Sequence, residues 1–221
     1  MALTKITGEG LGSLGTGNLT HGSDSGDTRF TLNSANQYTL VLKNAGNIAG
    51  QIGGSGSDVL RFSNAAGATI MEMNAGQITK PLQPAFLVQL TSNITNLTIN
   101  VDTTVTFGTE IFDQNSDFAS NTFTAPVSGK YQLSLQIRFN ELDVDGTFYE
   151  VKIFTSNREY RNIIDMRPFD ADVPNYTSIF TILADMDAGD TANVKVKPYN
   201  SGASQADIVA AHTYFSAFLA C

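Results

Sequence analysis

Cysteine, histidine and tryptophan are scarce in this sequence. Its 221 residues contain one cysteine, two histidines and no tryptophan. The single cysteine, Cys221, has no partner in the chain, so neither an intrachain disulfide nor a cysteine-based zinc site is expected. A Gly-x-Ser-x-Gly nucleophile motif is absent, and His21 and His212 lie in segments without a catalytic pattern. The composition favours a protein that is not an enzyme and that holds no cofactor and no metal.

Positive charge and long apolar runs are also scarce. Lys and Arg number 13 against 21 Asp and Glu, a formal net charge of −8, which argues against nucleic-acid binding because such proteins concentrate positive charge. No stretch approaches the roughly 18 apolar residues of a membrane span. Residues 1–30 also lack the apolar core of a secretory signal. We expect synthesis in the cytoplasm and no insertion into a membrane.

The composition changes near Lys80. Residues 1–80 contain 14 of the 19 glycines but only three of the 21 aromatic residues. Residues 81–221 carry the whole acidic excess. The prolines of the Lys80-Pro81-Leu82-Gln83-Pro84 segment favour extended backbone and cannot continue a helix. The sequence therefore predicts two domains, residues 1–80 and residues 81–221.

The first domain is expected to be a Gly-rich anchor or shaft built from short strands. Alternating segments at 30–32, 38–42, 59–62 and 69–73 are separated by turn clusters at 44–47 and 53–58. So few large apolar side chains cannot form a stable monomeric core, and a domain of this size often needs oligomerisation. We expect this half to fold against other chains.

The second domain shows the period-two alternation of half-buried strands. In residues 130–140 the apolar side chains fall on one face and the polar ones on the other. Further strands are expected at 98–107, 147–155, 176–183, 192–198 and 212–219. The Asp145-Gly146 pair predicts a two-residue hairpin turn, and turns are also expected at 156–157 and 188–189. This pattern predicts an antiparallel sandwich or jelly roll, in an all-β chain.

A motif in the second domain resembles the complement first-component globular head and the related tumour-necrosis-factor fold. The resemblance covers about residues 84–221, and its elements are Phe107, Asp113, Phe118, Phe123, Pro126, Gly129-Lys-Tyr131, Gly189 to Val194, and the closing segment 214–219. It implies a ten-stranded jelly-roll protomer that assembles as a tight homotrimer, with aromatic residues of the last strand near the threefold axis.

The first domain resembles the opening and shaft segments of bacteriophage fibre and appendage proteins. The resemblance lies in residues 1–7, the glycines that follow them, and the run 47–62. It implies a protein of the virion surface, held by its first half to a capsid or tail protein. A capsid decoration or head fibre and a short tail fibre both remain open. The alternative is a secreted globular-head ligand or lectin-like module.

Three further patterns offer candidate sites. Gly10-x-Gly12-x-x-Gly15 matches a dinucleotide fingerprint, but no helix pattern follows it. A strand that is flexible or clamped by a partner is therefore favoured. The acidic clusters 141–145 and 185–190 offer oxygen ligands for calcium, or are solvated hairpin turns.

The third pattern is the segment 158–170, which is expected to be a loop. It is the candidate for recognition of a host glycan or protein, because arginine and tyrosine are common in binding hot spots. A contact between protomers is the open alternative. The candidate contact residues are Arg158, Tyr160, Arg161, Arg167 and Phe169.

Overall fold

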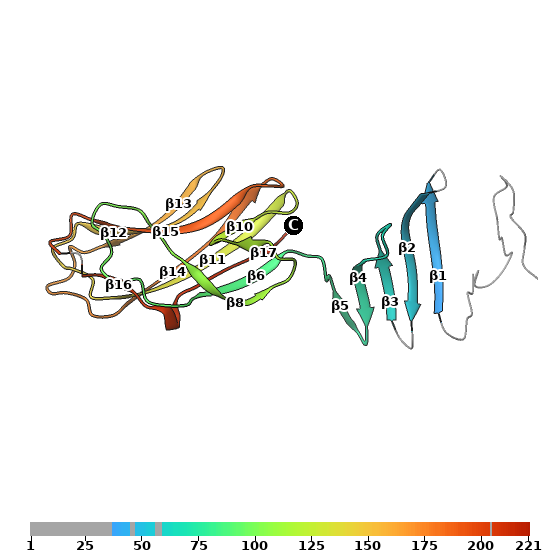
Figure 1. The fold of residues 1–221 in the computed structure, drawn as a ribbon, viewed down its shortest axis with the longest axis horizontal. Helices are drawn as coiled ribbons and strands as arrows, with labels where there is room; N and C mark the ends of the chain where they lie inside the picture. The colour runs from blue at the N-terminus through green and yellow to red at the C-terminus, as the bar shows by residue number, and fades with distance from the viewer. Residues whose placement is uncertain (1–36, 45–46, 56–58, 204) are drawn as a thin grey trace, which may run out of the picture.

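The computed structural model describes residues 37–44, 47–55, 59–203 and 205–221, and this part of the chain is all-β (Figure 1). Its one helical element is a 3-10 turn, η1 (Ala210–His212). Within these residues no helix has the length and apolar character needed to span a membrane. The segment 30–32 and the glycine run 8–17 lie outside the described residues.

An antiparallel sheet of five strands, the N-terminal sheet, precedes the head, which is formed by residues 85–221. Its strands follow one another in chain order: β1 (Gln37–Asn44), β2 (Asn47–Ser55), β3 (Val59–Ser63), β4 (Thr69–Asn74) and β5 (Gln77–Thr79). The strands predicted at 38–42, 59–62 and 69–73 are confirmed. Strand β2 was not predicted as a strand, and its end lies inside the expected turn cluster 53–58. Its glycines have low strand propensity, but pairing with β1 and β3 on both sides holds it extended.

One face of this N-terminal sheet carries apolar side chains. The register pairs Leu40 with Ile52, Ile52 with Phe62, and Phe62 with Met71, so these side chains share a face. The opposite face contains Gln51 and an ion pair between Arg61 and Glu72 (2.6 Å). No second layer formed by the described residues covers the apolar face. Its members are Leu40, Leu42, Ile52, Leu60, Phe62, Met71, Met73 and Ile78.

The head is a sandwich of two antiparallel sheets. Sheet I has the order β14 (Tyr176–Met186), β11 (Gly129–Asn140), β17 (Tyr214–Leu219), β6 (Ala85–Leu90) and β8 (Phe107–Asp113), with β16 (Asp207–Ile208) paired to β11. Sheet II has the order β13 (Glu159–Asp165), β12 (Phe148–Thr155), β15 (Thr191–Tyr199), β10 (Thr122–Thr124) and β9 (Phe118–Ala119), with β7 (Thr103–Thr104) paired to β15. The chain crosses repeatedly between the sheets, which is the jelly-roll arrangement.

The core lies between these two sheets. The apolar residues of β11 are buried, from Tyr131 to Phe139, as the alternation in 130–140 predicts. Phenylalanines fill the end of the sandwich nearest the N-terminal sheet. The Phe86 ring lies 4.9 Å from that of Phe118, 5.1 Å from that of Phe123 and 5.3 Å from that of Phe215.

Most predicted strands of the head are confirmed, and three local predictions are wrong. The Asp145-Gly146 hairpin does not exist, because β11 pairs with β14 and β17 while β12 belongs to the other sheet. The expected strand 98–107 contains only β7 and the start of β8. The expected loop 158–170 contains the edge strand β13. The turns at 156–157 and 188–189 are confirmed by the breaks between strands, and Gly189 has a φ of 92°.

Candidate functional site

The outer face of sheet I, which points away from the core, is largely uncharged. Alternation along β11 and β14 places glutamine, serine and threonine side chains beside large apolar ones. Ile179 is 69% exposed, Leu183 60% and Phe218 44%. The ion pair of Lys130 with Asp185 lies at one end of these strands. The central residues of this face are Gln132, Ser134, Gln136, Ile179, Thr181, Leu183, Tyr214, Ser216, Phe218, Ala85 and Leu87.

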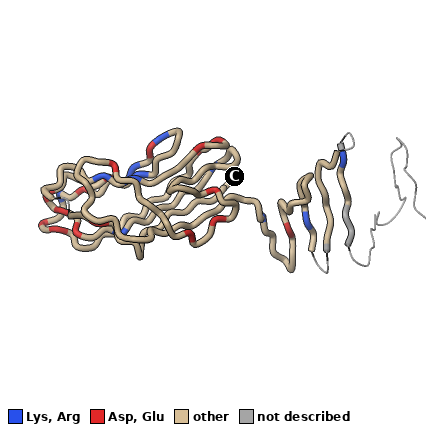
Figure 2. The backbone as a smooth tube through the Cα atoms, viewed as in Figure 1, with Lys and Arg blue, Asp and Glu red and all other residues tan. Residues whose placement is uncertain are grey.

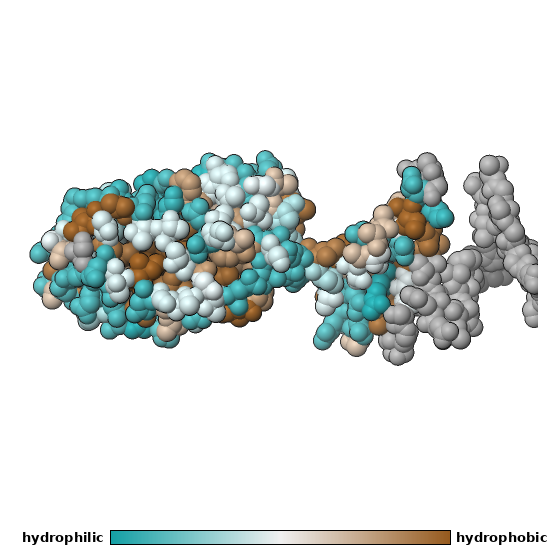
Figure 3. All heavy atoms as spheres, in the orientation of Figure 1, coloured by the Kyte–Doolittle hydropathy of each residue, from teal (hydrophilic) through white to brown (hydrophobic). Residues whose placement is uncertain are grey.

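The neck is the segment 80–84 between β5 and β6. A hollow at the neck lies between this face and the N-terminal sheet. It has a volume of about 340 Å³, and its lining includes Ile78 of the apolar face and Ala85 and Phe218 of sheet I. The rest of the lining is Lys80, Gln83, Pro84 and Gln114. Hydrophobic residues are visible at the neck in Figure 3. The two uncovered faces therefore meet in one hollow.

The segment between β5 and β6 is fastened to the head by side-chain amides. Gln114 Nε2 lies 3.1 Å from the carbonyl oxygen of Lys80, 2.8 Å from that of Pro81 and 2.9 Å from that of Gln83. Asn115 donates to the carbonyl of Leu82 at 3.2 Å. These bonds hold the neck in one position relative to β8.

We expect Gln114→Ala to loosen the neck without unfolding the head. The variant removes the donor to these carbonyls, while Gln114 itself is exposed and contributes little to the core. Limited proteolysis should cleave residues 80–84 several times faster than in the wild type, with an unchanged melting temperature of the head. Equal cleavage rates in the variant and the wild type would contradict the role of Gln114 in holding the neck.

The five predicted contact residues do not form one cluster. Arg158 lies in the turn between β12 and β13. Tyr160 packs against the core from β13, and Phe169 packs edge-on against Tyr176. Arg167 is exposed and pairs with Asp165 (2.6 Å). Of the five, Arg161 alone takes part in the charged cluster on sheet II described next. Their role in recognition remains a prediction.

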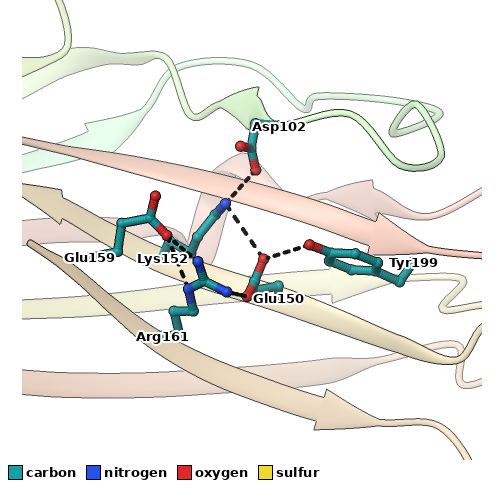
Figure 4. Close-up of polar contacts among 6 residues, drawn as sticks. All are labelled: Asp102, Glu150, Lys152, Glu159, Arg161 and Tyr199. Carbon is teal, nitrogen blue, oxygen red and sulfur yellow. Dashed lines mark hydrogen bonds and ion pairs between the residues drawn. The ribbon is translucent and has the colours of Figure 1, made fainter.

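The cluster around Arg161 contains two buried charged residues (Figure 4). Glu150 is 2% exposed and Lys152 4%. Lys152 Nζ lies 2.6 Å from Asp102 and 3.5 Å from Glu150, and Arg161 Nη1 lies 2.9 Å from the other oxygen of Glu150. Arg161 also contacts Glu159 (2.5 Å), and the Tyr199 hydroxyl donates to Glu150 (3.3 Å).

Burial alone lowers the pKa of Lys152. The hydrogen bond and negative charge of Asp102, together with Glu150 and Glu159, outweigh burial and raise this pKa above its usual value. Lys152 therefore stays charged at neutral pH. Sequence reasoning singled out Arg161 but missed Glu150 and Lys152. Both residues alternate with the apolar residues Tyr149, Val151 and Ile153, and this alternation was the sequence pattern that could have placed them together on one face of the strand.

The acidic side chains of the clusters 141–145 and 185–190 hold loops in place through backbone hydrogen bonds. Asp143 is 4% exposed and accepts the backbone N–H of Asp145 (2.9 Å) and of Ala203 (2.7 Å). Asp190 accepts the N–H of Asp187 at 2.8 Å. The described part of the chain contains no group of three His, Cys, Asp or Glu residues placed to hold a metal ion.

Comparisons with protein families and with curated proteins find no match. Among solved structures, the globular domain of zebrafish complement 1qA protein is similar at 18% identity, covering 62% of this chain and 98% of that chain, with a TM-score of 0.44. Murine APRIL at pH 8.0 and at pH 5.0 shows 12% and 14% identity with the same coverage and TM-score. The likeness concerns the fold alone. The resemblance of residues 1–80 to fibre proteins stays a prediction.

Proposed function

We propose that this protein is a non-enzymatic, homotrimeric appendage of a bacteriophage particle. Its residues 1–80 attach to a capsid or tail protein, and its head contacts the host or the capsid. The observation that carries the proposal is a pair of faces that the described residues leave uncovered and that meet at the neck, the apolar face of the N-terminal sheet and the outer face of sheet I.

Self-association explains why both faces are apolar or uncharged. A sheet with one hydrophobic face is stable only when another layer covers that face. Cyclic symmetry lets equivalent surfaces of several copies cover one another around a common axis. Because the two faces are continuous at the neck, one such axis serves the sheet and the head together. The family resemblance of residues 84–221 implies three copies.

Sedimentation of the full chain tests the trimer. We expect a species of three times 23.7 kDa at micromolar concentration. A monomer that melts cooperatively would contradict the proposal, because the apolar face would then be covered without a second copy.

The place in the virion rests on the resemblance of residues 1–7 and 47–62 to phage fibre openings. Mass spectrometry of purified particles should detect the protein, and its recovery only from cell-free secretions would favour the secreted ligand instead. Particles lacking a capsid decoration should release DNA at a lower temperature, whereas particles lacking a tail adhesin should fail to adsorb. These two outcomes separate the two attachment points.

A further inference from the structure

The outer face of sheet II contains three basic residues in one row. Register places Arg161 opposite Lys152, and Lys152 opposite Lys195, on the neighbouring strands β13, β12 and β15. Residues 81–221 have only eight basic residues against 16 acidic ones. Figure 2 shows blue segments close together on this sheet. Like charges directly opposite one another destabilise a sheet unless something compensates them, so this row requires an explanation.

The protein's own acids compensate only part of this positive charge. Asp102, Glu150 and Glu159 form ion pairs with Lys152 and Arg161, as described above. Among the described residues, no carboxylate forms an ion pair with Lys195 or with Lys197, which follows it on the same face of β15. Register places Glu150 opposite Lys197, but the ion pairs of Glu150 are with Lys152 and Arg161. Lys195 and Lys197 therefore lie beside this network without a carboxylate of the described residues at ion-pair distance.

Aromatic rings lie between these cations. Lys195 Nζ is 4.2 Å from the ring centroid of Phe154, and Lys197 Nζ is 4.4 Å from that of Tyr199. Tyr199 is stacked on Phe148 with centroids 4.2 Å apart. All of these side chains are partly exposed. Rings offer a flat apolar surface, and the ammonium groups beside them offer charge.

We propose that this face of sheet II binds an acidic saccharide chain. Lys195 and Lys197 pair with its anionic groups, the anchored guanidinium of Arg161 donates further hydrogen bonds, and the Phe148–Tyr199 stack contacts the C–H face of a sugar ring. The net charge of −8 does not prevent this, because at physiological ionic strength charges beyond about 8 Å are largely screened. The inference rests on the proposed contact function of the head and names its ligand class. It uses the sheet that self-association through sheet I leaves free.

Binding of the full-length protein to immobilised polygalacturonate tests the site, with neutral dextran as the reference surface. We expect Lys195→Gln/Lys197→Gln to weaken binding at least about tenfold. The matched control is Lys43→Gln/Lys130→Gln, which removes the same charge from other surfaces and should change binding less than twofold. Sedimentation of each variant shows whether the oligomer is intact, so a failure of this site is distinguished from a failure of the proposed assembly.

Three outcomes would overturn the proposal. One is equal loss of binding in the site variant and the control, which means diffuse electrostatic attraction. Another is that inorganic polyphosphate binds as tightly as polygalacturonate and depends equally on the two lysines. The site would then recognise charge alone, with no role for the aromatic rings. The third is no binding of the wild type above the dextran reference.

Discussion

Ile52→Glu will destabilise the N-terminal sheet and the proposed trimer. Ile52 lies on the central part of the apolar face, opposite Leu40 on one side and Phe62 on the other. In a trimer three carboxylates would enter one apolar interior. Loss of a buried isoleucine costs about 1.5–3 kcal/mol, and an unpaired buried charge adds several kcal/mol or forces the structure apart. We expect a melting temperature lower by more than about 10 °C and rapid proteolysis of residues 37–79.

Gln51→Glu is the matched control for this variant. Gln51 is the preceding residue on β2, its side chain lies on the opposite face, and the substitution changes the net charge equally. We expect its melting temperature and sedimentation to match those of the wild type. Similar damage from both substitutions would show that the apolar face is not a buried interface. Calorimetry, proteolysis and sedimentation provide the three measurements.

Ile179→Lys will weaken the proposed association of the heads without unfolding them. Ile179 lies on the outer face of sheet I and is 69% exposed, so a lysine there is readily hydrated in a single protomer. Across a threefold contact it places three ammonium groups in an uncharged surface, with a desolvation cost for each. We expect the concentration at which the trimer dissociates to rise at least about a hundredfold, while far-ultraviolet circular dichroism stays unchanged.

Ile163→Lys is the control for the head contact. Ile163 is 49% exposed on the outer face of sheet II, where it lies opposite Glu150, so an added lysine is tolerated there. The control should dissociate at the wild-type concentration. If both lysine variants remain equally associated, the outer face of sheet I is not the contact between heads.

The local sequence pattern was sufficient to predict the strands that have one buried face. The alternation in 130–140 predicts β11, because each inward residue is apolar and each outward one is polar. It was not sufficient where pairing is non-local. The Asp145-Gly146 pair is typical of a hairpin, yet the chain crosses there from sheet I to sheet II, a choice set by contacts with β14, β15 and β17.

The sites show the same division between local and non-local information. Arg161 was singled out from residue type, but its neighbours depend on the pairing of β12 with β13, which places it opposite Lys152. The row with Lys195 requires a third strand from much later in the chain. The apolar face of the N-terminal sheet likewise emerges only when its five strands are in register. Composition indicated too small a core for that half, but not where the missing contacts lie.

The strands of the head and those of the N-terminal sheet run in different directions, so the two respond differently to a pulling force. In Figure 1 the head strands run roughly along the long axis, whereas β1 to β5 run across it. Hydrogen bonds between antiparallel strands are perpendicular to the strands. Tension along the long axis would therefore shear many bonds at once in the head but open those of β1 to β5 one pair at a time. We therefore expect a pulling force along this axis to unfold β1 to β5 before the strands of the head.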